Sequence, residues 1–235
     1  MTTWWPYARL AASVLAVAAI VAQLVRSIDV ARSAETEYGQ HMPTVIANFF
    51  SFFTIESNVL AAVALAIGGI WALRQKDDKL VEPRWLAVLL VCASTYMIVT
   101  GVVYNTLLRG IPLPQGATVP WSNEVLHVVV PIIMLIDVLV APRRRALGWG
   151  AVGIAAIFPI VWVVYTLIRA NLVIAPATGN PYWYPYPFLD PHQPGGYGAV
   201  TLYVLLIAAI IIGAAAGVVW IGRRRGIRAA DISTT

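Results

Sequence analysis

Charged residues, cysteine and histidine are all scarce in this chain of 235 residues. Only 11% of the residues are charged, whereas 60% are hydrophobic, and the mean hydropathy is +0.76. This composition excludes an ordinary soluble domain and is typical of a membrane protein with several spans. The single cysteine, Cys92, excludes an intramolecular disulfide and a CxxC metal or redox motif. The net charge of +5 lies in short basic loops between apolar runs, so we expect membrane lipids, and no nucleic acid, as partners.

Six apolar segments are long enough to cross a bilayer. The alternation of polar and apolar residues that is typical of an outer-membrane barrel is absent. We therefore predict a single all-α domain, a polytopic bundle of six transmembrane helices. The first segment resembles a secretory signal but is long for one, so we expect it to be retained. The predicted helices cover residues 7–25, 47–73, 85–108, 123–140, 148–168 and 200–221, and a long loop covers residues 170–199.

Basic residues gather in alternate loops, which orients the predicted bundle. By the positive-inside rule, the second and fourth loops and both termini lie in the cytoplasm, and the other loops lie outside. We expect a bacterial plasma membrane as the location. Twelve of the 16 Lys and Arg residues define this orientation: Arg9, Arg74, Lys76, Lys79, Arg84, Arg143, Arg144, Arg145, Arg223, Arg224, Arg225 and Arg228.

Polar side chains interrupt the start of the second predicted helix. Carboxylates and amides are costly in hydrocarbon, and they often mark function there. Thr54 and Asn58 are four residues apart and share a helix face, whereas Glu56 points away and is expected to contact another helix. This end of the helix is therefore the first place to look for a site.

The predicted orientation brings further polar residues to the same membrane level. The third helix places Tyr104 and Asn105 near its outer end, and the fourth helix begins with Asn123 and His127, which share a face. Asp137 lies ten residues beyond His127, roughly 15 Å deeper, which is too far for direct pairing in a straight helix. We therefore expect a polar site near the outer face of the membrane.

A threonine hydroxyl and an imidazole in one buried pocket form a candidate nucleophile and general base. The unperturbed pKa of histidine lies near neutrality, which suits His127 to this role. The side-chain amides of Asn58, Asn105 or Asn123 can donate to a developing oxyanion. The alternative is a structural polar cluster in which Thr54 bonds to its own helix.

Several short blocks, taken in order, resemble one family. The blocks are Phe53-Thr54-Ile55, then Asn123 with His127 and Asp137, and then Tyr186-Pro187-Phe188-Leu189-Asp190 before the last helix. They resemble the androgen-induced family of multi-span membrane hydrolases, to which the androgen-dependent TFPI-regulating protein belongs. The chain is also similar to bacterial six-span integral membrane proteins without an assigned activity.

The resemblance implies an intramembrane hydrolase of fatty-acid esters of hydroxy fatty acids. It implies that Thr54 is the nucleophile and His127 the base, and that no cofactor is needed. We expect the substrate to enter sideways from the lipid, and the aromatic, proline-rich loop to form a lid. The further candidates for substrate binding or polar support are Glu56, Asn58, Asn105, Asn123, Glu124, Tyr186 and Asp190.

Two other classes of function stay open at this point. The topology places His41, His127 and His192 on one side of the membrane, as a zinc hydrolase would require, although their spacing matches no known ligand pattern. A non-enzymatic lipid-binding or transport protein would leave the polar cluster structural. Transport predicts an internal repeat, which we do not find. The oligomeric state is not specified by any pattern in the chain.

Overall fold

The protein is a bundle of long apolar helices. The structure, a computed structural model, describes residues 4–77, 80–111 and 118–233, and it contains no strand in these ranges. Within these ranges, six helical spans have the length and hydropathy to cross a membrane, which confirms the prediction of an all-α bundle with six such helices. The spans are α1 (Trp5–Arg32), α4 (Phe53–Arg74), α5 (Arg84–Val103) continued by η1 (Tyr104–Leu108), α6 (Pro120–Glu124) continued by η2 (Val125–Val129) and α7 (Val130–Val140), α8 (Gly150–Ala170) and α9 (Gly196–Ser233).

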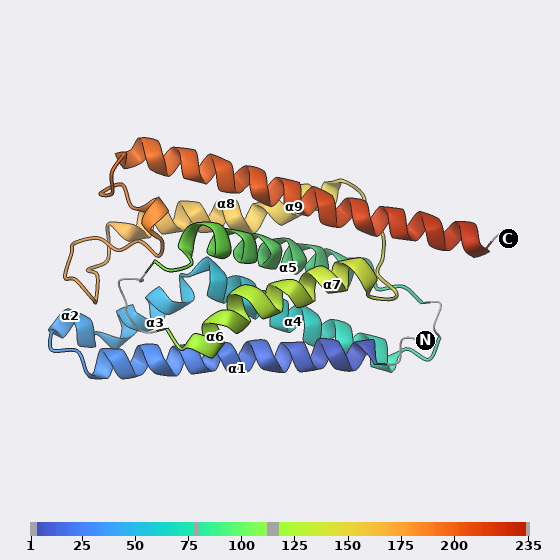
Figure 1. Cartoon of the computed structure of the whole chain (residues 1–235), viewed down its shortest axis with the longest axis horizontal. Helices are drawn as coiled ribbons and strands as arrows, with labels where there is room; N and C mark the ends of the chain where they lie inside the picture. The colour runs from blue at the N-terminus through green and yellow to red at the C-terminus, as the bar shows by residue number, and fades with distance from the viewer. Residues whose placement is uncertain (1–3, 78–79, 112–117, 234–235) are drawn as a thin grey trace.

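The helices lie side by side, with α5 at the centre (Figure 1). Helix α5 contacts α4, α7, α8 and α9 and is the most buried of the six spans, whereas α1 packs along α4. Helix α1 begins and α9 ends at the same end of the bundle, which we call the termini end (Figure 1). The opposite end, called the site end, carries α2 (Glu37–Gln40), α3 (Met42–Phe50), α6 and the 171–195 loop with η3 (Pro187–Leu189).

The outer faces of α8 and α9 consist of large apolar side chains. Ile157, Ile160 and Val161 of α8 are about 60% exposed, and Leu202 and Leu205 of α9 are more than 60% exposed. A continuous apolar face of this kind is costly in water and stable in hydrocarbon. The six apolar helices therefore indicate an integral membrane protein.

The second predicted helix, 47–73, differs from the structure because it is interrupted. Helix α3 ends at Phe50, and α4 begins at Phe53 after an extended Phe52 with φ −73° and ψ 126°. The Ser51 hydroxyl donates to the Ala47 carbonyl at 2.7 Å and so satisfies the end of α3. Thr54 consequently lies in the first turn of α4 instead of about two turns inside a longer helix.

Two helices that the sequence predicts as regular contain a π-helical turn at the site end. In η1 the Arg109 N–H donates to the Tyr104 carbonyl, and in η2 the Val130 N–H donates to the Val125 carbonyl. Such turns are rare in proteins as a whole, and those that do occur are often found at functional sites. The remaining boundaries agree within a few residues, except that α1 and α9 extend beyond the predicted 7–25 and 200–221. Lys79, one of the orienting basic residues, lies outside the described residues.

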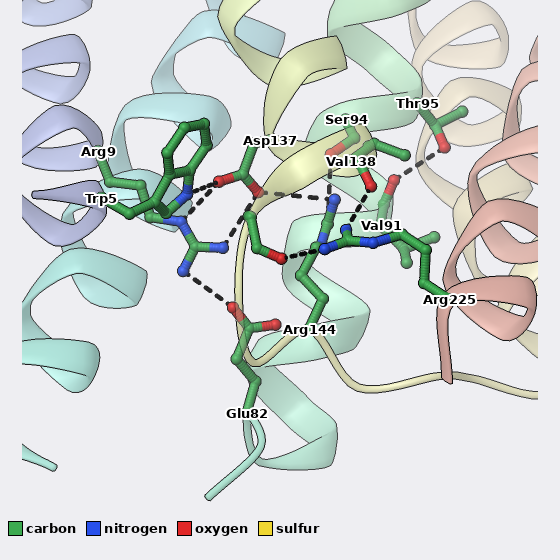
Figure 2. A network of polar contacts seen from close by, with 11 residues as sticks. Trp5, Arg9, Glu82, Val91, Ser94, Thr95, Asp137, Val138, Arg144 and Arg225 are labelled. Carbon is green, nitrogen blue, oxygen red and sulfur yellow. Dashed lines mark hydrogen bonds and ion pairs between the residues drawn. The ribbon is translucent and has the colours of Figure 1, made fainter. Parts of the chain in front are cut away.

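A network of buried charges ties the termini end together (Figure 2). Arg9 donates from Nε and Nη2 to the Asp137 carboxylate at 2.7 and 3.1 Å, and its Nη1 lies 2.9 Å from Glu82. Trp5 Nε1 donates to Asp137 at 2.9 Å, and Arg144 lies 3.6 Å from the same carboxylate. Arg9, Glu82 and Asp137 are all buried. The network thus connects α1 and α7 to the loops that follow α4 and α7.

Arginine side chains also hold the termini end together by hydrogen bonds to backbone carbonyls. Arg225 of α9 donates to the Val138 and Ala141 carbonyls at 2.8 and 2.6 Å, which satisfies the last turn of α7. Arg145 donates to the Glu82 carbonyl at 2.6 Å. Two loops, the end of α7 and the Arg225 turn of α9 are therefore held in one arrangement.

Candidate active site

Thr54 and His127 are hydrogen-bonded to each other at the site end. Thr54 Oγ1 lies 3.2 Å from His127 Nε2, although the two residues are 73 positions apart. Thr54 is buried in the first turn of α4, and the turn that precedes it belongs to α3. The break before α4 therefore explains why the hydroxyl bonds to an imidazole instead of to its own helix.

The second ring nitrogen of His127 fixes the tautomer. Nδ1 lies 2.9 Å from the Asn123 carbonyl oxygen. Because a carbonyl only accepts, Nδ1 carries the hydrogen, and Nε2 presents its lone pair to the Thr54 hydroxyl. The Tyr104 ring stacks on the imidazole with centroids 3.9 Å apart, which holds the plane of the ring. His127 is thus arranged to accept the Thr54 proton.

Tyr186 places a phenol beside the same hydroxyl. Its OH lies 3.2 Å from both Thr54 N and Thr54 Oγ1. A first-turn N–H has no partner within its helix, so the phenol oxygen accepts it. Burial raises the pKa of Tyr186 to about 12, so the phenol keeps its proton at neutral pH and donates it toward Thr54 Oγ1. The sequence had suggested Tyr186 only as polar support.

An apolar cavity of about 170 Å³ lies between α5, α8 and α9, with Thr54 and Tyr186 in its wall. Ile160 and Ile212 also line it and are 60% and 52% exposed, so the cavity opens between α8 and α9 toward the lipid. On α9 it runs from Val204 to Ile212, which is about 12 Å at 1.5 Å per residue. An apolar space of this length suits an acyl chain.

Asn58 supports the site from α4. Its Nδ2 donates to the Thr54 carbonyl at 2.9 Å and to the Leu126 carbonyl at 3.1 Å. The side chain therefore links the turn that carries Thr54 to the segment that carries His127. Because both bonds use the amide nitrogen, we assign Asn58 to positioning and not to the oxyanion.

Asn105 and Asn123 also lie one step away from the reacting groups. Asn123 Nδ2 donates to the Tyr104 OH, and Asn105 Nδ2 donates to the Gly101 and His127 carbonyls at 2.7 and 3.4 Å. Their amide groups thus bond to the Tyr104 hydroxyl and to the His127 backbone, and not to the imidazole or to Thr54. The expected oxyanion role of these amides has no support in this geometry.

Glu124 is part of an exposed ion pair at the site end. Both its oxygens accept from Arg109 at 3.0 Å, and Arg109 Nε donates to Asn105 Oδ1 at 2.8 Å. Glu124 and Arg109 are nearly half exposed, so the pair contributes little to stability. It holds the Asn105 side chain in place.

Among the described residues, no hydrogen bond or ion pair joins Glu56 or Asp190 to Thr54 or His127. The Glu56 Oε2 is buried and has no hydrogen-bond partner in the described parts of the chain. The Asp190 carboxylate accepts from the His192 backbone N–H at 2.9 Å and from Gln193 Nε2 at 3.2 Å, so it braces the loop before α9. Neither residue belongs to the reacting group.

The three histidines of the zinc alternative are not brought together. His41 Nδ1 lies 2.8 Å from the Thr44 hydroxyl, and His192 lies 2.8 Å from Asp190 and stacks on Tyr182. Within residues 4–77, 80–111 and 118–233, no three His, Cys, Asp or Glu side chains form a group that could hold a metal ion. The geometry therefore gives the zinc hydrolase no ligand set.

The site as a whole supplies a hydroxyl, a base and a hydrogen-bond donor beside an apolar cavity. Both the base and the donor lie 3.2 Å from Thr54 Oγ1. Comparisons with protein-family models, with curated proteins and with solved structures find no match to this chain. Its chemistry is therefore inferred from these contacts.

Proposed function

We propose that the protein hydrolyses lipid esters inside the membrane, with Thr54 as nucleophile and His127 as general base. The observation that carries this proposal is the 3.2 Å contact between Thr54 Oγ1 and the lone pair of His127 Nε2. The contact lies beside an apolar cavity that opens toward the lipid. The resemblance to the androgen-induced family suggests fatty-acid esters of hydroxy fatty acids as substrates.

The reaction proceeds in two balanced halves. His127 Nε2 takes the proton of Thr54 Oγ1 while the oxygen attacks the ester carbonyl carbon. The tetrahedral intermediate then expels the alcohol oxygen, which receives the proton from Nε2, and an acyl-threonine is left. In the second half His127 takes a proton from water, the hydroxide attacks the acyl carbon, and Thr54 regains its proton as the fatty acid leaves.

Two features stabilise the negative charge of the intermediate. The Tyr186 O–H lies 3.2 Å from Thr54 Oγ1 and can turn to the oxyanion. The positive end of the α4 dipole lies at the same place, because Thr54 is in the first turn of this helix of 22 residues. Together they supply the role that the sequence had given to the asparagine amides.

Replacing Tyr186 with Phe is expected to lower kcat by about 10²-fold, with a small change in KM, because the lost O–H acts on the oxyanion more than on the ground state. It also leaves the buried Thr54 N–H unpaired, which costs about 1–3 kcal/mol of stability. Steady-state kinetics and thermal unfolding of both proteins check this. Tyr182→Phe, which alters an outer tyrosine of the same loop, is the control. A Tyr186→Phe protein with wild-type kcat would remove Tyr186 from the mechanism.

The test of the nucleophile is covalent labelling with a long-chain fluorophosphonate. Attack by Oγ1 forms a P–O bond and releases fluoride, so digestion and mass spectrometry should place the adduct on Thr54. Heat-unfolded protein should not react, since the activation depends on His127. An adduct on another residue of a folded, ester-cleaving protein would reject Thr54 as the nucleophile. A Ser57→Ala control tests the nearest hydroxyl of the same helix.

The orientation of the bundle is proposed from charge. Arg9, Arg144 and Arg225 lie at the termini end, so the positive-inside rule puts that end in the cytoplasm of a bacterial cell and the site end outside. The second candidate function, lipid binding without catalysis, draws on the apolar cavity alone. A purified protein that binds lipid esters but never cleaves them would favour it.

A further inference from the structure

Three buried polar groups of α3 and α8, near the site end, have no hydrogen-bond partner in the described parts of the chain. They are Asn48 Nδ2, Thr166 Oγ1 and Arg169 Nη1. Asn48 is 1% exposed and Thr166 is 3% exposed. Buried donors in folded proteins are almost always paired, because leaving them unpaired costs free energy. All three groups can donate, so they share a requirement for an acceptor.

The three groups come from two elements, α3 and α8, which are in contact at this place. Arg169 Nη2 of α8 donates to Asn48 Oδ1 of α3 at 2.7 Å. Lower on the same helix, Trp162 Nε1 donates to the Ser51 carbonyl at 3.1 Å. Thr166 follows Trp162 by four residues and precedes Arg169 by three, so it lies on the same face of α8. Helical spacing therefore places Thr166 on the face of α8 that contacts residues 48–51, between the two contacts.

No ion pair with a carboxylate is found for Arg169 among the described residues. Arg9 and Arg144 lie against Asp137 at the termini end, and Arg109 pairs with Glu124. Among the described residues Arg169 has only the neutral Asn48 and the face of Trp183, 5.5 Å from its guanidinium carbon. A guanidinium with two further donors beside it is best satisfied by an anion with several oxygens.

We propose that Asn48, Thr166 and Arg169 bind the anionic group, a carboxylate or phosphate, of a lipid whose chain occupies the cavity. Trp162 lies between the cavity and the three donors. It lines the cavity and precedes Arg169 by seven residues, about 10 Å along α8. The assignment of this lipid as the substrate rests on the proposed function. The substrate is then an ester that also carries a free anionic group.

The test compares binding of palmitic acid, at a pH at which it is ionised, with binding of methyl palmitate to the purified protein in a neutral detergent. Wild type is expected to bind the acid more tightly. Arg169→Gln is expected to weaken binding of the acid by about 10- to 100-fold, the range for a lost charged hydrogen bond, and to leave methyl palmitate unchanged. Arg32→Gln, which alters an exposed arginine at the end of α1, is the matched control and should bind both as wild type does.

Thr166→Val keeps the charge of Arg169 and the shape of the threonine side chain. It serves as the second variant if Arg169→Gln does not fold. It should weaken binding of the acid several-fold, whereas a hydroxyl without a ligand could be removed with no such loss. Equal binding of acid and methyl ester by wild type, or an unchanged preference in both variants, would overturn the anion site. Competition by inorganic phosphate or acetate at the same concentration as the acid would overturn the lipid assignment.

The two proposals fail in different ways. Wild type that prefers the acid in binding but cleaves no ester keeps the anion site and rejects the hydrolase. Wild type that cleaves charged and methylated esters with the same KM keeps the hydrolase and rejects the anion site.

Discussion

Replacing His127 with Ala is expected to lower kcat for lipid ester hydrolysis by about 10³-fold or more. Thr54 Oγ1 then has no base within reach, because His127 Nε2 at 3.2 Å is the only imidazole nitrogen bonded to it among the described residues. Thr54→Ala should cause at least the same loss, since it removes the attacking atom. Steady-state kinetics with a long-chain ester in detergent micelles measures both.

The double variant separates a joint mechanism from two independent effects. If the hydroxyl and the imidazole act in one step, Thr54→Ala combined with His127→Ala is expected to lose no more activity than the worse single variant. Losses that multiply would contradict a shared step. The control is His41→Ala, because His41 is exposed and bonds to Thr44 instead of Thr54.

Replacing Asp137 with Ala is expected to destabilise the protein by about 3–5 kcal/mol. The carboxylate accepts two hydrogen bonds from Arg9 and one from Trp5 and lies 3.6 Å from Arg144. Its removal leaves two buried guanidinium groups with only Glu82 as a counter-charge. Thermal unfolding in detergent, or titration with a denaturing detergent, measures the loss.

A matched pair of variants tests whether buried charge is the cause. Asp137→Asn keeps the size of the side chain and an oxygen that can accept from Trp5, so it should cost less than Asp137→Ala. Asp190→Asn, at a carboxylate that is not part of the network, should change stability by less than about 1 kcal/mol. An Asp137→Ala protein as stable as wild type would show that the network contributes nothing to folding.

The sequence predicts the bundle and the pair at its centre for a simple physical reason. An uninterrupted apolar run of about 20 residues has few folded forms available to it in a bilayer, so the six spans follow from composition. Counting residues from the membrane surface then sets Thr54 and His127 at one level. The sequence alone leaves their pairing a hypothesis, and the structure brings their side chains into contact.

Other features depend on contacts between distant segments. Residues 48–53 contain no Gly or Pro, so the break before α4 has no local signal. The π turns that position Tyr104 and His127 have no sequence signature either. Tyr186 reaches Thr54 across 132 positions through an irregular loop, and only the resemblance pointed to it. Glu82 lies in a loop whose inward fold is set by Arg9 and Arg145.

The network of buried charges at the termini end affects which membrane leaflet can exchange lipids with the cavity. None of the residues that line the cavity belongs to that network, and the cavity opens sideways between α8 and α9. If the protein hydrolyses esters as proposed, an ester taken from one monolayer returns its acid and alcohol to the same monolayer. Under the proposed function, the protein changes the lipid composition of one leaflet only. The orientation of the bundle in the membrane decides which leaflet that is.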